Sequence, residues 1–286
     1  MDNIWKKLNT LKPINQIKHA EKEFGIFIPN KLQSILIFIG KKSFLKRGIF
    51  RPSYTKFIMS LSLGPLDIFF RGCAYRIWNE KNLIEYGLLL DPNYNHKDID
   101  FLINGSSHDS NFIDIGSNIG LYSLPMALAS PKGKTISIDA NPLMQSRLNF
   151  NKKSSKISNI KMINIAVSDK KGFGVLKIRK DDIAIVALDE SQNGDVEIST
   201  LNEILKNNKI NKIYGLKIDI EGHEDKALVP FLMNAPKKIL PKKIVIERPN
   251  KSQDYPGCKL AFEKLNYKLV GCSKNNSFYE LIKNEK

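Results

Sequence analysis

The feature that most constrains this chain is an apolar segment that runs through a glycine-containing turn into a helix. Residues 111–121 read Asn-Phe-Ile-Asp-Ile-Gly-Ser-Asn-Ile-Gly-Leu. Glycine lets the backbone approach a ligand without a Cβ in the way, and the N-terminus of the following helix offers unpaired N–H groups to polar or anionic atoms. Gly116 and Gly120 meet both demands, so the segment predicts a strand, a ligand-binding loop and a helix.

A carboxylate at the end of the next predicted strand strengthens this interpretation. The strand Thr135–Ile138 ends at Asp139, which lies 19 residues after Gly120. Folds that bind dinucleotides place an acid near this position to accept hydrogen bonds from ribose hydroxyls. The G-x-G-x-x-G fingerprint of dehydrogenases is absent because its central position is Asn118, so the loop is not shaped for tight approach to a pyrophosphate. A plain glycine turn followed by a helix N-cap is the alternative interpretation.

The organisation of the chain changes at Asn111, after which short apolar runs alternate with segments of helical length. This alternation is typical of βαβ units and a parallel sheet. Residues 97–286 are therefore predicted to form one α/β domain, and residues 1–96 a mainly helical N-terminal region that binds substrate or forms a lid. The predicted strands are Phe112–Ile115, Thr135–Ile138, Lys161–Val167, Ile213–Ile218 and Lys243–Ile246, with extra strands at Phe173–Ile178 and Ile183–Leu188 and a closing antiparallel hairpin of Tyr267–Val270 and Ser277–Ile282. Helices are predicted at Ile14–Phe24, Lys31–Ile39 and Lys97–Asn104, and after Asn118, Pro142, Ser199 and Gly222.

A second group of polar residues follows the predicted strand Ile213–Ile218. Asp219, Glu221 and His223 come directly after it. Ligands of open α/β sheets bind beyond the carboxyl ends of the strands, so these residues are expected beside the glycine loop, where a carboxylate or histidine can take a proton from a substrate. The alternative is structural: Asp219 caps the next helix, the glutamates favour its N-terminal end and His223 is merely exposed. Glu247 ends a neighbouring strand, and three converging acids can hold Mg²⁺, although no ligand spacing supports a metal.

The overall charge favours anionic partners but names none. The chain carries 45 Lys and Arg against 29 Asp and Glu, a formal charge of +16, and the basic residues are scattered along it. Such a charge favours nucleic acid, phosphorylated glycans or an acidic membrane face, and a lysine-rich genome is the alternative explanation. The three cysteines form no C-x-x-C pair, which indicates neither a zinc site nor a disulfide framework. The apolar run at residues 35–39 is far shorter than the ~20 residues of a membrane span, so a cytoplasmic protein without a transmembrane segment is expected.

At these positions the sequence resembles the FkbM-type methyltransferases. The resemblance covers about residues 111 to 247, and its motifs occur in the same order and spacing as in the family. The matching residues are Asp114-x-Gly116-x-Asn118-x-Gly120, Asp139-Ala140-Asn141-Pro142, Ala166-Val167-Ser168-Asp169 and Lys217-Ile218-Asp219-Ile220-Glu221-Gly222-x-Glu224. The sequence departs from the family at Asn202, where an aspartate is usual, and at Ala140, where a proline usually follows the acid.

The resemblance implies a Rossmann-like class I methyltransferase fold of about seven mostly parallel strands, with S-adenosylmethionine as methyl donor. Most often it implies a hydroxyl acceptor on a sugar or another natural product. Carried over by position, the loop of Asp114, Gly116, Ser117, Asn118 and Gly120 would lie on the methionine side. Asp139 would hold the ribose, Ala166 would lie near the adenine, and Lys217, Asp219 and Glu221 would line the acceptor side.

These observations together predict an O-methyltransferase that acts on a glycan or another small-molecule acceptor. Asp219 or Glu221 would orient or deprotonate the hydroxyl, with His223 as a further candidate. One alternative is a nucleic-acid or protein N-methyltransferase; nucleic acid is not expected as a partner, because Asp91-Pro92-Asn93-Tyr94 lacks the second proline of the tetrad of adenine-directed enzymes. The others are a catalytically silent binding module on the same fold and a nicotinamide oxidoreductase. The acceptor, the metal dependence and the oligomeric state do not follow from the sequence.

Overall fold

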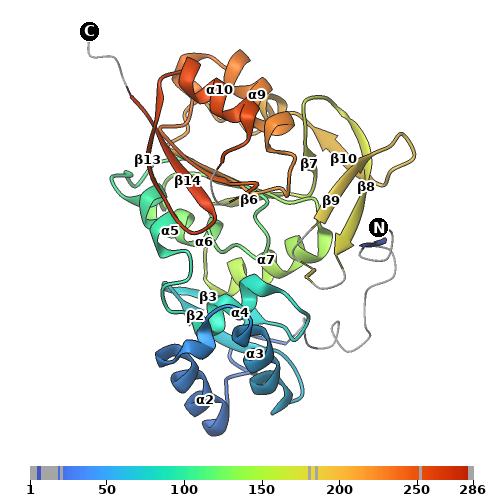
Figure 1. Cartoon of the computed structure of the whole chain (residues 1–286), viewed down its shortest axis with the longest axis vertical. Helices are drawn as coiled ribbons and strands as arrows, with labels where there is room; N and C mark the ends of the chain where they lie inside the picture. Colours follow the sequence, from blue (N-terminus) through green and yellow to red (C-terminus); the bar gives the residue numbers. More distant parts are fainter. Residues whose placement is uncertain are drawn as a thin grey trace.

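In the computed structural model the chain is an α/β protein built around one large sheet (Figure 1). The structure describes residues 5–7, 19, 22–179, 182–183, 186–250 and 253–282. The large sheet has the strand order β13-β14-β12-β11-β4-β5-β6, and only β14 runs against its neighbours. The predicted mostly parallel seven-stranded sheet with a C-terminal antiparallel hairpin is confirmed. In the same order, the strands are Tyr267–Cys272, Asn276–Leu281, Lys243–Glu247, Gly215–Ile218, Phe112–Ile115, Thr135–Ile138 and Ile160–Ile163.

The helices of this domain cover both faces of the sheet. Because alternate residues of a strand point to opposite faces, Phe112 of β4 belongs to one apolar core while Ile113 and Ile115 belong to another. Helices α5, α6 and α7 pack into the first core, and α8, α9 and α10 into the second. The helices are α5 His96–Ile103, α6 Ser123–Ala129, α7 Pro142–Ser154, α8 Leu201–Asn207, α9 Glu224–Asn234 and α10 Pro256–Lys264, with a 3₁₀ turn, η3, at Lys237–Ile239.

A smaller sheet lies beside the large one, and it changes one prediction. The predicted strand Lys161–Val167 is two strands: β6 ends at Ile163, and β7 (Ala166–Val167) belongs to the smaller sheet. The chain turns between them, where the Asn164 side chain donates a hydrogen bond to the carbonyl oxygen of Asp139 at 2.7 Å. The smaller sheet contains β1 Trp5–Lys7, β7, β8 Gly172–Arg179, β9 Val186–Glu190 and β10 Val196–Ser199; β10 and α10 were not predicted.

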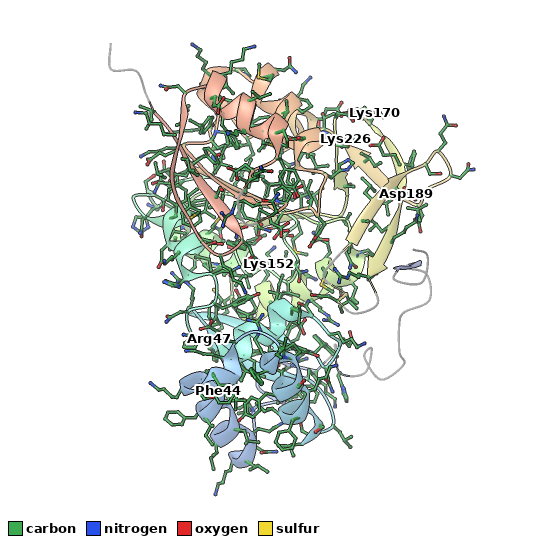
Figure 2. All side chains as sticks on the ribbon, in the orientation of Figure 1. Phe44, Arg47, Lys152, Lys170, Asp189 and Lys226 are labelled. Carbon is green, nitrogen blue, oxygen red and sulfur yellow. The ribbon has the colours of Figure 1, made fainter. Side chains whose placement is uncertain are left out.

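The N-terminal region lies at the end of the molecule opposite α9 and α10 (Figures 1 and 2). Its helix α2 begins after Asn30, whose side chain accepts from the Gln33 N–H while the Gln33 side chain accepts from the Asn30 N–H. Of the predicted helix at residues 14–24, most lies outside the described residues, and residues 22–24 are not helical. None of the described helices is long and apolar enough to cross a bilayer. The elements are α2 Lys31–Lys42, η2 Phe44–Lys46, α3 Phe50–Ser60, β2 Leu66–Phe70, β3 Cys73–Ile77 and α4 Leu83–Leu90.

Buried polar contacts fix this region and join it to the α/β domain. Within the region, the Arg76 guanidinium holds the Asp67 carboxylate through two bonds of 2.7 and 2.9 Å, and both side chains are buried. Arg147 of α7 donates to Glu85 of α4 at 2.6 Å. Removing one partner of such a buried pair leaves an uncompensated charge, so both pairs tie their elements firmly.

Candidate active site

The glycine loop between β4 and α6 is held against two neighbouring strand ends. The N–H groups of Gly116 and Ser117 donate to the Ile138 carbonyl oxygen at 2.9 and 3.1 Å. Gly116 has a φ of 76°, and a Cβ added to it would lie 1.8 Å from the Asp219 carbonyl oxygen. Only glycine fits this backbone conformation and this close approach. The loop therefore brings the ends of β4, β5 and β11 together.

Asp139 connects the loop to the end of β5. Its carboxylate accepts hydrogen bonds from the backbone N–H groups of Asn118, at 2.7 Å, and Asn141, at 2.8 Å. Burial raises the pKa of Asp139 to about 6, and the two N–H donors limit the rise. The Asn118 side chain also accepts from the Asn82 amide at 3.2 Å, so the N-terminal region contacts the loop directly.

Asp114 and Lys217 lie beneath the loop. Asp114 is fully buried; one carboxylate oxygen accepts from the Ser123 hydroxyl, and the other has no hydrogen-bond partner among the described residues. The Lys217 ammonium donates to the Gly116 carbonyl oxygen at 3.1 Å and lies 3.3 Å from Asp219. Burial acts to lower the pKa of Lys217, but the carboxylates of Asp219 and Asp114 outweigh it and raise the pKa overall. Lys217 therefore stays charged under the loop.

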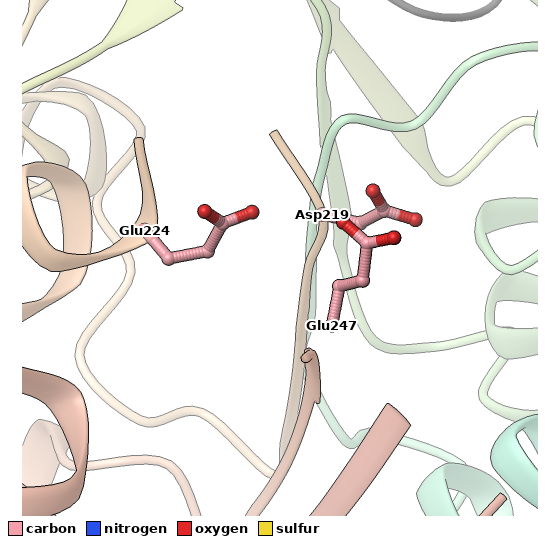
Figure 3. Close-up of side chains that lie close together, drawn as sticks. All are labelled: Asp219, Glu224 and Glu247. Atoms are coloured by element: carbon pink, nitrogen blue, oxygen red, sulfur yellow. The ribbon is translucent and has the colours of Figure 1, made fainter. Parts of the chain in front are cut away.

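Three carboxyl groups meet beyond the carboxyl ends of β11 and β12 (Figure 3). Oxygens of Asp219, Glu224 and Glu247 all lie within 4.8 Å of one another. Burial, with the neighbouring charges of Asp219 and Glu221, raises the pKa of Glu247 well above its usual range. Glu247 is therefore protonated at neutral pH and is hydrogen-bonded to Asp219.

The same cluster is a poor metal site as it stands. Both oxygens of Glu224 accept backbone hydrogen bonds, from Ile220 at 2.8 Å and from Gly222 at 2.9 Å. Glu247 holds a proton, and a hard dication requires deprotonated oxygen ligands. We therefore assign Glu224 to shaping the turn after β11, and Mg²⁺ remains without support.

Glu221 and His223 occupy that turn. Glu221 adopts a φ of 56°, and burial against the cavity wall, with the charges of Asp219 and Glu224, raises its pKa to about 7. The His223 ring nitrogen Nε2 lies 3.0 Å from the Ser168 hydroxyl, and burial lowers the pKa of the ring. The structural alternative is wrong in two details: His223, and not Asp219, is the N-cap of α9, and its side chain is only 17% exposed.

These residues surround a cavity of about 1080 Å³. Gly116, Ser117, Asn118, Asp139, Ala166, Asp219, Glu221 and His223 line it, whereas Asp114 and Gly120 lie outside its wall. The sequence analysis missed several walls of the cavity. These are Arg51 and Tyr94 from the N-terminal region, Asp182, and the β13–β14 turn at residues 273–276. The turn could have been found, because β13 runs parallel to β12 and so ends at the same edge of the sheet.

Comparisons with known proteins agree with this geometry. Among solved structures, the chain is similar to M. jannaschii TYW2 in complex with AdoMet (15% identity, 77% of this chain and 88% of that one, TM-score 0.40). It is also similar to a precorrin-6y C5,15-methyltransferase from Geobacter metallireducens (12%, 65% and 86%, TM-score 0.42) and an rRNA methylase from Streptococcus thermophilus (12%, 66% and 96%, TM-score 0.38). Likenesses this weak do not identify a substrate, and no protein of curated function matches the sequence. The methyltransferase FkbM domain matches residues 114–269, more than half of the chain and all of the loop and carboxylate motifs. The chain therefore belongs to the FkbM methyltransferase family.

Proposed function

We propose that the chain transfers a methyl group from S-adenosylmethionine to a hydroxyl group of a sugar, glycan or related natural product. The observation that carries the proposal is the meeting of Asp219, Glu221 and Glu247 beside the glycine loop in one cavity. Membership of the FkbM family supports the donor, and the carboxyl groups support a hydroxyl acceptor whose proton must be removed.

The residues around the loop fit S-adenosylmethionine. Ser117 Oγ and Asn141 Nδ2 are buried, belong to residues that line the cavity, and have no hydrogen-bond partner among the described residues. Buried polar groups in native proteins are nearly always paired, so unpaired ones at a cavity indicate a polar ligand. Gly116, Asn118 and Asp139 would hold the donor here, and Ala166 would lie against its base. When bound, the donor supplies an electrophilic methyl carbon on a sulfonium.

The carboxyl groups would then act on the acceptor. Glu221, with a pKa of about 7, is half ionised at neutral pH and can take the proton of the acceptor hydroxyl as its oxygen attacks the methyl carbon. Asp219 stays between the Lys217 ammonium and the protonated Glu247, where it can accept a hydrogen bond that orients the hydroxyl. His223 is a weaker candidate, because its Nε2 already lies at hydrogen-bond distance from Ser168.

The test is transfer of an isotope-labelled methyl group to a panel of glycans, nucleotide sugars, RNA and unfolded protein. We expect label on a carbohydrate hydroxyl, with a rate that rises with pH through about 7, because Glu221 must lose its proton before it can act as a base. Label on RNA or protein alone would replace the O-methylation proposal with the N-methyltransferase alternative. A rate that is flat between pH 6 and 8, in a sample that transfers label, would remove Glu221 from the role of base.

A further inference from the structure

The N-terminal helices expose large apolar side chains. On α2, Leu32, Ile35, Phe38 and Ile39 are 45–63% exposed, while Gln33, Ile37 and Gly40 face the interior. The adjoining η2 and α3 segment adds Phe44 at 64%, Ile49 at 83%, Phe50 at 50% and Phe57 at 52%. We call this set of eight side chains the α2–α3 face. Single exposed apolar residues are ordinary, but such a group marks an interaction surface.

The elements that carry the α2–α3 face lie next to one another. The rings of Phe44 and Phe50 meet edge to face with centroids 5.1 Å apart. The Tyr54 hydroxyl of α3 donates to the Leu36 carbonyl oxygen of α2 at 2.8 Å. In Figure 2, Phe44 and Arg47 mark this end of the molecule, far from α9 and α10.

The charge of the same segment is one-sided. Residues 24–66 contain no Asp or Glu. None of their cationic side chains forms an ion pair with another residue of the described chain. Exposed aromatic and aliphatic residues among Lys and Arg are the composition of surfaces that lie in the headgroup layer of anionic bilayers. The seven cations are Lys31, Lys41, Lys42, Lys46, Arg47, Arg51 and Lys56.

We propose that the chain docks on an anionic membrane surface through the α2–α3 face, with the surrounding lysines and arginines contacting lipid phosphates. A lipid bilayer fits better than a folded protein partner, because it presents negative charge above an apolar layer and so matches both properties of the segment. Lys46, Arg47 and Arg51 also line the catalytic cavity, so its mouth adjoins the docking surface. Docking itself does not depend on the proposed reaction.

The test is flotation of the full chain with vesicles of phosphatidylcholine alone or of equal parts phosphatidylcholine and phosphatidylglycerol. We expect binding to the anionic vesicles only, weakened by salt. Phe38→Ser/Phe44→Ser and Lys41→Glu/Lys42→Glu should each lower the bound fraction constant by at least about tenfold. None of these four residues lines the cavity.

Matched controls come from the opposite part of the molecule. Leu260→Ser/Leu269→Ser removes two side chains that are 67% and 57% exposed, and Lys237→Glu/Lys238→Glu reverses an exposed lysine pair; both should bind vesicles like the wild type. The proposal is overturned if the wild type does not prefer anionic vesicles, or if the controls lose as much binding as the test variants. Wild type that is dimeric, becomes monomeric as Phe38→Ser/Phe44→Ser and ignores vesicles would assign the face to a second copy of the chain.

Discussion

Gly116→Ala should lower the free energy of unfolding by at least about 3 kcal/mol, since an inserted Cβ must displace backbone and also pay for a left-handed conformation. The Cβ would lie 1.8 Å from the Asp219 carbonyl oxygen, and a carbonyl oxygen cannot rotate away as a side chain can. The strand ends of β4 and β11 would separate, and with them the loop and the acid that the cavity needs. Chemical denaturation measures the change.

Gly172→Ala is the matched control for this substitution. A Cβ at Gly172 meets no atom within 4 Å, and its φ is not positive. Its unfolding free energy should stay within about 0.5 kcal/mol of the wild type, as is usual for surface substitutions. A Gly116→Ala protein as stable as the Gly172→Ala control would show that β4 and β11 do not approach this closely.

Asp219→Asn should lower kcat for methyl transfer by about 100-fold or more, the lower end of what a positioned proton-accepting or orienting carboxylate contributes. The substitution keeps the shape of the side chain but removes the charge that faces the Lys217 ammonium at 3.3 Å and that is hydrogen-bonded to Glu247. The dissociation constant for S-adenosylmethionine should change much less than kcat, because Asp219 is assigned to the acceptor side. Steady-state transfer with the best acceptor, beside calorimetry, separates the two effects.

The control is Asp195→Asn, which neutralises an exposed carboxylate outside the cavity wall. Its rate should match that of the wild type. If Asp219→Asn folds, binds the donor and retains full turnover, Asp219 has no part in the reaction and Glu221 alone would carry the acceptor chemistry.

The parts of the site that the sequence predicts are those in which strand and ligand-binding loop are adjacent in the chain. Phe112–Ile115 and Thr135–Ile138 are strands with the predicted bounds, because each is a short apolar run closed by a carboxylate. Asp139 and Asp219 could be placed at one edge of the sheet because the carboxyl ends of parallel strands share that edge.

The rest of the site depends on tertiary contacts that no local pattern encodes. Arg51 and Tyr94 reach the cavity from a region without a motif, where buried pairs such as Arg147 with Glu85 fix the approach of the elements. The protonation of Glu247 follows from burial beside Asp219, which is a property of the assembled fold. The strand predicted at residues 161–167 fails for the same reason, since a side-chain bond from Asn164 to the end of β5 turns the chain.

The central claim is that the cavity binds S-adenosylmethionine through the glycine loop and Asp139. The most direct measurement is a calorimetric titration of the wild type and Asp139→Ala with S-adenosylmethionine, with NADH as the control ligand and thermal unfolding as the check on folding. We expect micromolar-range binding to the wild type, no binding of NADH, and affinity weakened at least about tenfold in the variant, which loses a charged acceptor. A folded wild type that binds no S-adenosylmethionine would contradict the account and favour a silent module on the same fold.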